Sequence, residues 1–101
     1  GLIFQNQIYE EDISSYWMVC FLTRKQSERD DLRNFLAENN IETRPIFNPI
    51  HLMNMYHTSS DKFKNSVAIS KRGINLPSFP SLKITDLIYI CETIENFYKL
   101  Q

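Results

Sequence analysis

Residues 44–51, RPIFNPIH, place side chains that can bind a ligand on a segment with little conformational freedom. His51 closes the segment, and an imidazole can both donate and accept a hydrogen bond to a ligand. Pro45 and Pro49 fix their own φ angles and disfavour helical geometry at the residue before each of them. We therefore predict a stiff, extended arm that aims His51 at a ligand. The alternative is a helical-turn histidine whose imidazole bonds a nearby backbone carbonyl.

Three further residues in and after the arm are candidates for substrate binding. Arg44 can hold a phosphate or a carboxylate, and an ion pair with Glu42 or Asp61 within the domain is the equal alternative. Phe47 and Tyr56 can stack on a sugar or a base, whereas packing inside the domain is the more frequent role of such side chains. With His51, these residues make up the predicted substrate-binding set.

Residues for metal binding or amine chemistry are not evident in this chain. His57 lies in the polar stretch YHTSSDK, where a solvated loop histidine is expected. A metal-dependent hydrolase that uses His51 and His57 is disfavoured, because no third ligand clusters with them and their spacing does not aim both at one ion. A reactive amine needs burial or a neighbouring charge, and the lysines all stand in polar stretches (Lys25, Lys62, Lys64, Lys71, Lys83 and Lys99). We predict no catalytic, cofactor-binding or metal-binding residue here.

The elements that must position the arm begin with YWMVCFL at residues 16–22. This run is apolar, favours β structure and is too short for a helix, so it predicts a central strand covered on both faces, with Trp17 in the core. A helix follows, with Ser27 as its N-cap. Asn40 is expected to end that helix, because asparagine tolerates the left-handed conformation at a C-cap.

After the arm, HLMNMY predicts one helical turn, and DKFKNSVAISKR predicts a short helix that Gly73 ends. The stretch INLPSFP predicts a brief strand broken by Pro77 and Pro80. The last helix is expected to start at Thr85 as N-cap, with an inner face made of Leu87, Cys91, Ile94 and Tyr98. Three helices and about three short strands predict an α+β fold, a two-layer sandwich of a short, mainly antiparallel sheet packed against the helices.

Length and composition limit the class of protein. A chain of 101 residues fits one domain, and we predict a lead-in segment at 1–13 and the domain at 14–101. The net charge is -1, and acidic and basic residues are mixed along the chain. The sequence therefore has no basic cluster that would attract nucleic acid or an anionic membrane, and neither partner is expected. Cys20 and Cys91 lack metal-ligand spacing and are predicted to be buried, reduced thiols. No spanning segment or signal peptide is visible, and a cytoplasmic location is predicted.

The order of the motifs carries a resemblance over nearly the whole chain. The motifs are YWM at 16–18, RD opening a helix at 29–30, NNIETRPIFNPIHLMNMY at 39–56 and INLPSFPSL at 74–82, before a closing helix. This succession resembles the C-terminal small domain of the DegT/DnrJ/StrS sugar aminotransferases, and it is most similar to the perosamine-synthase-like branch. Two positions depart from the family pattern: Asn40 replaces the usual glycine, and Asn54 replaces a frequent proline.

The resemblance implies a pyridoxal-phosphate enzyme that moves an amino group from glutamate to a keto carbon of a nucleotide-linked sugar, commonly as a homodimer. It implies that His51 lies at the mouth of the sugar-binding site. The Schiff-base lysine and the phosphate cradle of the family belong to a large N-terminal domain without counterpart in this chain. We therefore expect the chain alone to bind no pyridoxal phosphate and to be inert, with that catalytic domain, the nucleotide sugar and a second copy as its partners.

A rival interpretation is a free-standing, non-catalytic binding or interaction module of the same fold. The aminotransferase interpretation predicts an exposed apolar face where the large domain belongs.

Overall fold

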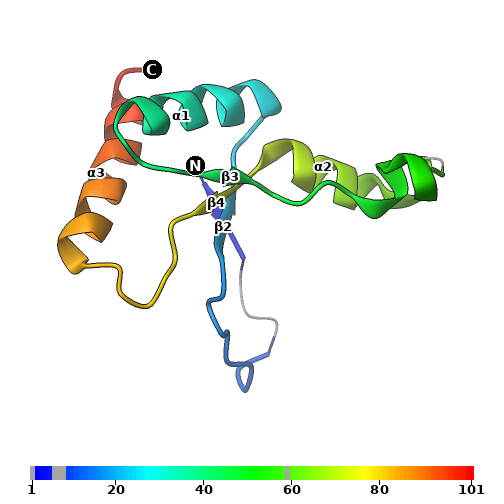
Figure 1. Cartoon of the computed structure of the whole chain (residues 1–101), viewed down its shortest axis with the longest axis horizontal. Helices are drawn as coiled ribbons and strands as arrows, with labels where there is room; N and C mark the ends of the chain where they lie inside the picture. Colours follow the sequence, from blue (N-terminus) through cyan, green and yellow to red (C-terminus); the bar gives the residue numbers. More distant parts are fainter. Residues whose placement is uncertain (1, 6–8, 59) are drawn as a thin grey trace.

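A four-stranded antiparallel sheet in the order β1-β2-β4-β3 carries the fold (Figure 1). Its strands are β1 (Ile3–Phe4), β2 (Val19–Leu22), β3 (Arg44–Pro45) and β4 (Gly73–Leu76). The computed structural model describes residues 2–5, 9–58 and 60–101. β1 lies within the segment 1–13 that the sequence predicts as a lead-in, and it pairs with β2 at the edge of the sheet.

Three helices complete the fold, namely α1 (Gln26–Glu38), α2 (Lys64–Arg72) and α3 (Ile84–Lys99). Short 3-10 turns at Ile50–Leu52, Asn54–Tyr56 and Ser60–Phe63 follow, the first of them at the end of the arm and the other two between it and α2. Figure 1 shows α1 and α3 together on one side of the sheet, while α2 extends away from α3. The predicted α+β architecture with an antiparallel sheet and three helices is confirmed.

The core lies between the sheet and the helices α1 and α3. Phe21 and Ile74 face each other across β2 and β4, and both are buried. They join a cluster of side chains from α1, from α3 and from the turn that follows α1. These are Leu32, Leu36, Ile41, Ile90, Ile94 and Phe97. Each such side chain contributes roughly 1.5–3 kcal/mol when fully buried, so this cluster holds the two layers together.

The central strand is shorter than predicted, since β2 begins at Val19 rather than at residue 16. Tyr16 has φ 48°, a left-handed conformation that cannot continue an extended ladder. The chain bends there, and the side chain of Trp17 is 72% exposed. The prediction that Trp17 packs in the core is therefore wrong.

The end of α1 is confirmed and its start is not. Asn40 has φ 59°, its N–H bonds the Ala37 carbonyl at 3.0 Å, and the Ile41 N–H bonds the Leu36 carbonyl at 2.9 Å. These two bonds form a Schellman motif, and Ile41 and Leu36 add the apolar contact that accompanies it. At the other end the N-cap is Lys25, without a side-chain bond, so the prediction of Ser27 is wrong.

Gly73 ends α2 as predicted, whereas α3 differs from the prediction in its start and its inner face. It begins at Ile84, not after a Thr85 cap. Its buried residues are Ile90, Thr93, Ile94 and Phe97. The ring of Phe97 lies 5.5 Å from that of Phe35 on α1, and this contact orients the helix so that Cys91 is exposed. The prediction of a buried Cys91 is wrong.

Cys20 is half-buried, and its thiol donates to Asn75 Oδ1 at 2.6 Å across β2 and β4. Burial raises the pKa of this thiol. A thiol that stays protonated is a poor nucleophile, so Cys20 is a structural residue of the sheet.

A buried carboxylate links α1 to α3. Glu28 accepts from the Tyr98 hydroxyl at 2.7 Å and from Arg24 Nε at 3.0 Å, and its side chain is only 4% exposed. Burial acts to raise the pKa of Glu28, but the hydrogen bonds from Tyr98 and Arg24 and the charge of Arg24 outweigh it and leave the pKa below its usual value. The cluster therefore stabilises the fold most when Glu28 is ionised.

Glu28→Gln is expected to lower the free energy of unfolding at pH 7 by about 1–3 kcal/mol, because a neutral amide replaces a paired buried charge. The pKa of Glu28 is lower in the folded state than the value of about 4.3 in the unfolded chain. The stabilisation by Glu28 is therefore complete above the unfolded pKa and is lost as the pH falls through the lower folded pKa. Urea unfolding followed by circular dichroism should show a steeper loss of stability from about pH 5 to pH 3 in the parent chain than in Glu28→Gln. Equal slopes would contradict this account.

Candidate functional site

The arm runs along the edge of the sheet as β3. Pro45 lies opposite Ile74 of β4, and a proline is tolerated there because an edge strand has one side without a partner. The next residue, Ile46, occupies the space that a side chain on Gly73 would need. Its N–H bonds the Gly73 carbonyl at 3.4 Å. The extended path predicted for the arm is confirmed at its start, where the sheet holds Arg44 and Pro45, whereas Ile50 and His51 at its end belong to a 3-10 turn.

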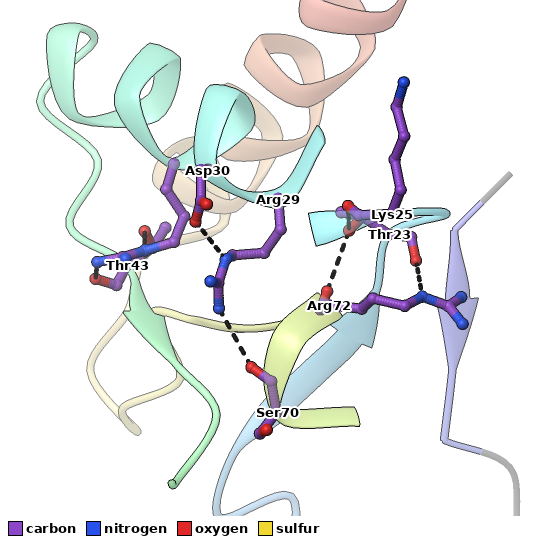
Figure 2. Close-up of polar contacts among 8 residues, drawn as sticks. Thr23, Lys25, Arg29, Asp30, Thr43, Ser70 and Arg72 are labelled. Carbon is purple, nitrogen blue, oxygen red and sulfur yellow. Dashed lines mark hydrogen bonds and ion pairs between the residues drawn. The ribbon is translucent and has the colours of Figure 1, made fainter. Parts of the chain in front are cut away.

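A set of polar contacts fixes α2 against α1 and against the end of β2 (Figure 2). Arg29 Nη1 donates to the Ser70 carbonyl at 3.2 Å, and Arg72 Nε donates to the Thr23 carbonyl at 2.6 Å. The Thr23 N–H in turn bonds the Arg72 carbonyl at 3.0 Å. A guanidinium at the last carbonyls of α2 also complements the negative end of the helix dipole. These contacts fix the position of α2, which follows the turns that carry His51.

His51 lies on the 3-10 turn Ile50–Leu52 that ends the arm, with its ring centroid 4.7 Å from that of Phe63. It borders an open hollow of about 520 Å³, whose other walls include Phe47, Asn48, Tyr56, Thr58, Phe63 and Ser66. Its Nε2 atom is buried and has no hydrogen-bond partner among the residues that the structure describes. The carbonyl bond of the alternative interpretation is therefore not made by Nε2. A buried polar atom without a partner costs about 1–3 kcal/mol, so a ligand that supplies one would be favoured.

The two candidate aromatic residues face solvent. Phe47 is 66% exposed and Tyr56 is 61% exposed, so the prediction that they pack inside the domain is wrong. Tyr56 borders the His51 hollow, and Phe47 lies between this hollow and a second one. Both rings are accessible to a ligand.

The second hollow, of about 440 Å³, contains Arg44. Its walls also include Trp17, Glu42, Phe47, Asn75 and Ser78. Arg44 Nη2 lies 3.3 Å from Glu42 Oε1, and both side chains are about 80% exposed. An ion pair this exposed contributes little, so the guanidinium is free to exchange its partner for a ligand. The predicted set thus divides between two hollows that share Phe47.

Sequence reasoning missed Trp17 and Phe63. The apolar run around Trp17 favoured a core strand, and only the left-handed turn at Tyr16 brings its ring to the surface. Phe63 stands in a polar stretch without periodicity, and its contact with His51 depends on the packing of two separate turns. The predicted loop histidine, His57, is exposed.

The described residues offer no setting for a cofactor lysine or a metal. All six lysines are exposed. No group of three His, Cys, Asp or Glu side chains among residues 2–5, 9–58 and 60–101 could hold a metal ion. Over the same ranges, none of the helices has the length and apolar character that a bilayer span requires.

Comparison with known proteins identifies the fold and the family. The chain superposes on an aminotransferase from Streptoalloteichus hindustanus with a TM-score of 0.84 at 21% identity, covering 93% of this chain and 25% of that one. It is 50% identical over 95 residues to the GDP-perosamine synthase of Escherichia coli O157:H7, covering 91% of this chain and 26% of that protein. The GDP-perosamine synthase of Vibrio cholerae is 38% identical over 99 residues, with 91% and 27% covered.

The chain therefore spans about a quarter of the length of these curated relatives. Residues 3–95 match the family model described as the DegT/DnrJ/EryC1/StrS aminotransferase family, which covers nearly all of the sheet, the arm and the helices. The chain belongs to the DegT/DnrJ/EryC1/StrS aminotransferase family.

Proposed function

We propose that this chain is the C-terminal small domain of a pyridoxal-phosphate-dependent enzyme that transfers an amino group from glutamate to a GDP-linked keto sugar. The observation that carries this proposal is the 50% identity to the GDP-perosamine synthase of Escherichia coli O157:H7 over 95 residues. Because the chain spans 26% of that relative, the remaining three quarters of such an enzyme must supply the chemistry that this chain lacks.

The residues of the chain do not fit pyridoxal phosphate. A Schiff-base lysine must lose its proton near neutral pH, which requires burial or a neighbouring cation. All six lysines are solvent-exposed, so none meets this condition. We infer that the chain alone binds no cofactor and is inert. In the complete enzyme another domain would hold pyridoxal phosphate, which acts as the electron sink of the reaction.

The proposed contribution of this chain is substrate binding. Rotation of the His51 imidazole about its Cβ–Cγ bond would turn a ring nitrogen into the hollow, where a sugar hydroxyl or phosphate oxygen can satisfy it. Support comes from the unpartnered Nε2 atom and from Phe63, which holds the ring from one side. Tyr56 borders the same hollow and can pack on the sugar, and Arg44 can hold a phosphate.

The proposed protein partners are the catalytic domain of the same polypeptide and a second copy in a homodimer. An apolar hollow of about 440 Å³ opens on the sheet beside β1, and it is lined by Ile3, Phe4, Cys20, Leu22, Ile46 and Ile69. Ile3 and Phe4 are about half exposed, which is costly unless another surface covers them. Two free cysteines fit the reducing cytoplasm, where we place the enzyme.

The coding sequence that adjoins Gly1 tests this proposal. We expect an in-frame sequence that supplies the other three quarters of the family's length, with a lysine in a Schiff-base setting and a phosphate-binding helix start. A start codon immediately before Gly1 would contradict the proposal and favour the free-standing binding module.

A further inference from the structure

Trp17 and Phe47 form an aromatic pair on the surface, the Trp17–Phe47 pair. Their ring centroids lie 6.5 Å apart and their planes differ by 28°, so the rings are stacked. The two side chains are 72% and 66% exposed. Large aromatic rings gain most from burial, so two stacked and exposed rings mark a surface that another planar group can cover.

The backbone holds the Trp17–Phe47 pair in place at a cost. Tyr16, directly before the tryptophan, has φ 48°, a conformation that costs a bulky residue roughly 1–3 kcal/mol and is found mainly where function requires it. The Ser78 hydroxyl donates to the Trp17 carbonyl at 3.2 Å and fixes the bend. On the other side, Pro45 and Pro49 limit the freedom of the segment that carries the phenylalanine.

Two charged groups lie in the same hollow as the rings. Glu42 and Arg44 are both about 80% exposed and are joined by a 3.3 Å contact that contributes little. A carboxylate accepts hydrogen bonds from ring N–H groups, and a guanidinium binds phosphate. A ligand that uses all four side chains must therefore combine a planar ring with N–H donors on its edge and an anionic phosphate.

Guanine nucleotides have this combination, because guanine carries donors at N1 and at the exocyclic N2 on one edge. Uracil has a single N–H, and adenine has one amino group. The hollow of about 440 Å³ lies within the range of roughly 300–1,000 Å³ found for small-molecule sites.

From these contacts we infer that the Trp17–Phe47 pair is the platform for the guanine ring of a guanosine diphosphate group, with Glu42 accepting from its N–H donors and Arg44 holding its phosphates. This inference rests on the proposed function and adds a place for the base beside the hollow that contains His51. The two hollows share Phe47, so base and sugar would occupy adjoining positions.

Fluorescence of the 101-residue chain tests the platform, because Trp17 is its only tryptophan. GDP is expected to quench this emission in a saturable way, with Kd on the order of 1 mM for a few weak contacts. Phe47→Ala and Arg44→Gln both keep the reporter, and each should raise Kd about 5- to 10-fold. Lys83→Gln removes an exposed cation outside this hollow and should leave Kd unchanged. N-acetyltryptophanamide, titrated alongside, corrects for light absorbed by the nucleotide.

Two outcomes would overturn the inference. One is quenching no stronger than that of N-acetyltryptophanamide up to about ten times the expected Kd. The other is equal quenching by GDP, ADP and UDP, which would exclude recognition of the guanine edge by Glu42. Neither outcome touches the proposed function, since that proposal depends on the adjoining coding sequence and on amino transfer rather than on the Trp17 signal.

Discussion

Replacing His51 by alanine is expected to lower kcat/KM for the nucleotide sugar about 10- to 100-fold in a hybrid enzyme, equivalent to the loss of a hydrogen bond worth roughly 1.4–2.7 kcal/mol. The hybrid carries residues 3–95 of this chain in place of the matching quarter of the GDP-perosamine synthase of Escherichia coli O157:H7. The reason is the buried Nε2 atom, which has no partner within the described chain, and a rotated imidazole would offer a ring nitrogen to a substrate oxygen in the hollow.

His57→Ala is the matched control, because this histidine is exposed and does not border the His51 hollow. It should leave kcat/KM within about twofold of the parent hybrid. His51→Asn keeps a donor and an acceptor and should recover part of the activity. The pyridoxal-phosphate absorbance of each variant checks that the catalytic domain is intact. Equal activity of His51→Ala and His57→Ala would remove His51 from the substrate site.

Gly73→Val is expected to lower the free energy of unfolding by about 3 kcal/mol, near the upper end of overpacking effects. A Cβ at this position would lie 2.0 Å from Ile46 Cδ1, 2.5 Å from Cγ1 and 3.0 Å from Cβ. Rotation of the Ile46 side chain relieves the first two contacts but not the third, so the arm itself must move. Gly73 has φ -86° and ψ 144°, a conformation that valine adopts easily, so the backbone adds no strain. The higher β propensity of valine is worth at most about 1 kcal/mol and is too small to offset the clash.

The double variant Gly73→Val with Ile46→Ala separates this contact from other effects. Removing the isoleucine side chain opens space for the valine, so the double variant should be at least about 1 kcal/mol more stable than the sum of the two single changes predicts. Chemical denaturation of the four chains measures the coupling. Additive effects would show that Ile46 does not set the requirement for glycine at this position.

Local signals in the sequence predicted the helices and strands well where nearby residues determine the conformation. Asn40 is a clear case, because an asparagine after an amphipathic helix predicts the left-handed residue that the structure has. Pro45 likewise predicted the extended start of the arm, although the arm ends in a 3-10 turn at Ile50 and His51. In contrast, the inner face of α3 depends on the contact of Phe97 with Phe35 on another helix, and no pattern within residues 84–99 contains that information.

The candidate site was predictable in its residue types but not in its geometry. The four residues predicted to bind substrate stand close together in the sequence, yet the structure divides them between two hollows that share Phe47. Trp17 joins them from a segment 30 residues away, through a bend at Tyr16 that the apolar pattern hides. The absence of a partner at His51 Nε2 is also a property of the folded chain alone.

Formation of GDP-perosamine by the unmodified hybrid enzyme tests the central claim most directly, because the product appears only if this chain completes the substrate site of a sugar aminotransferase. With glutamate and the nucleotide sugar supplied, we predict product formation by the hybrid and none by the 101-residue chain alone. A hybrid that folds, binds pyridoxal phosphate and forms no GDP-perosamine would contradict the assignment of this chain to such an enzyme.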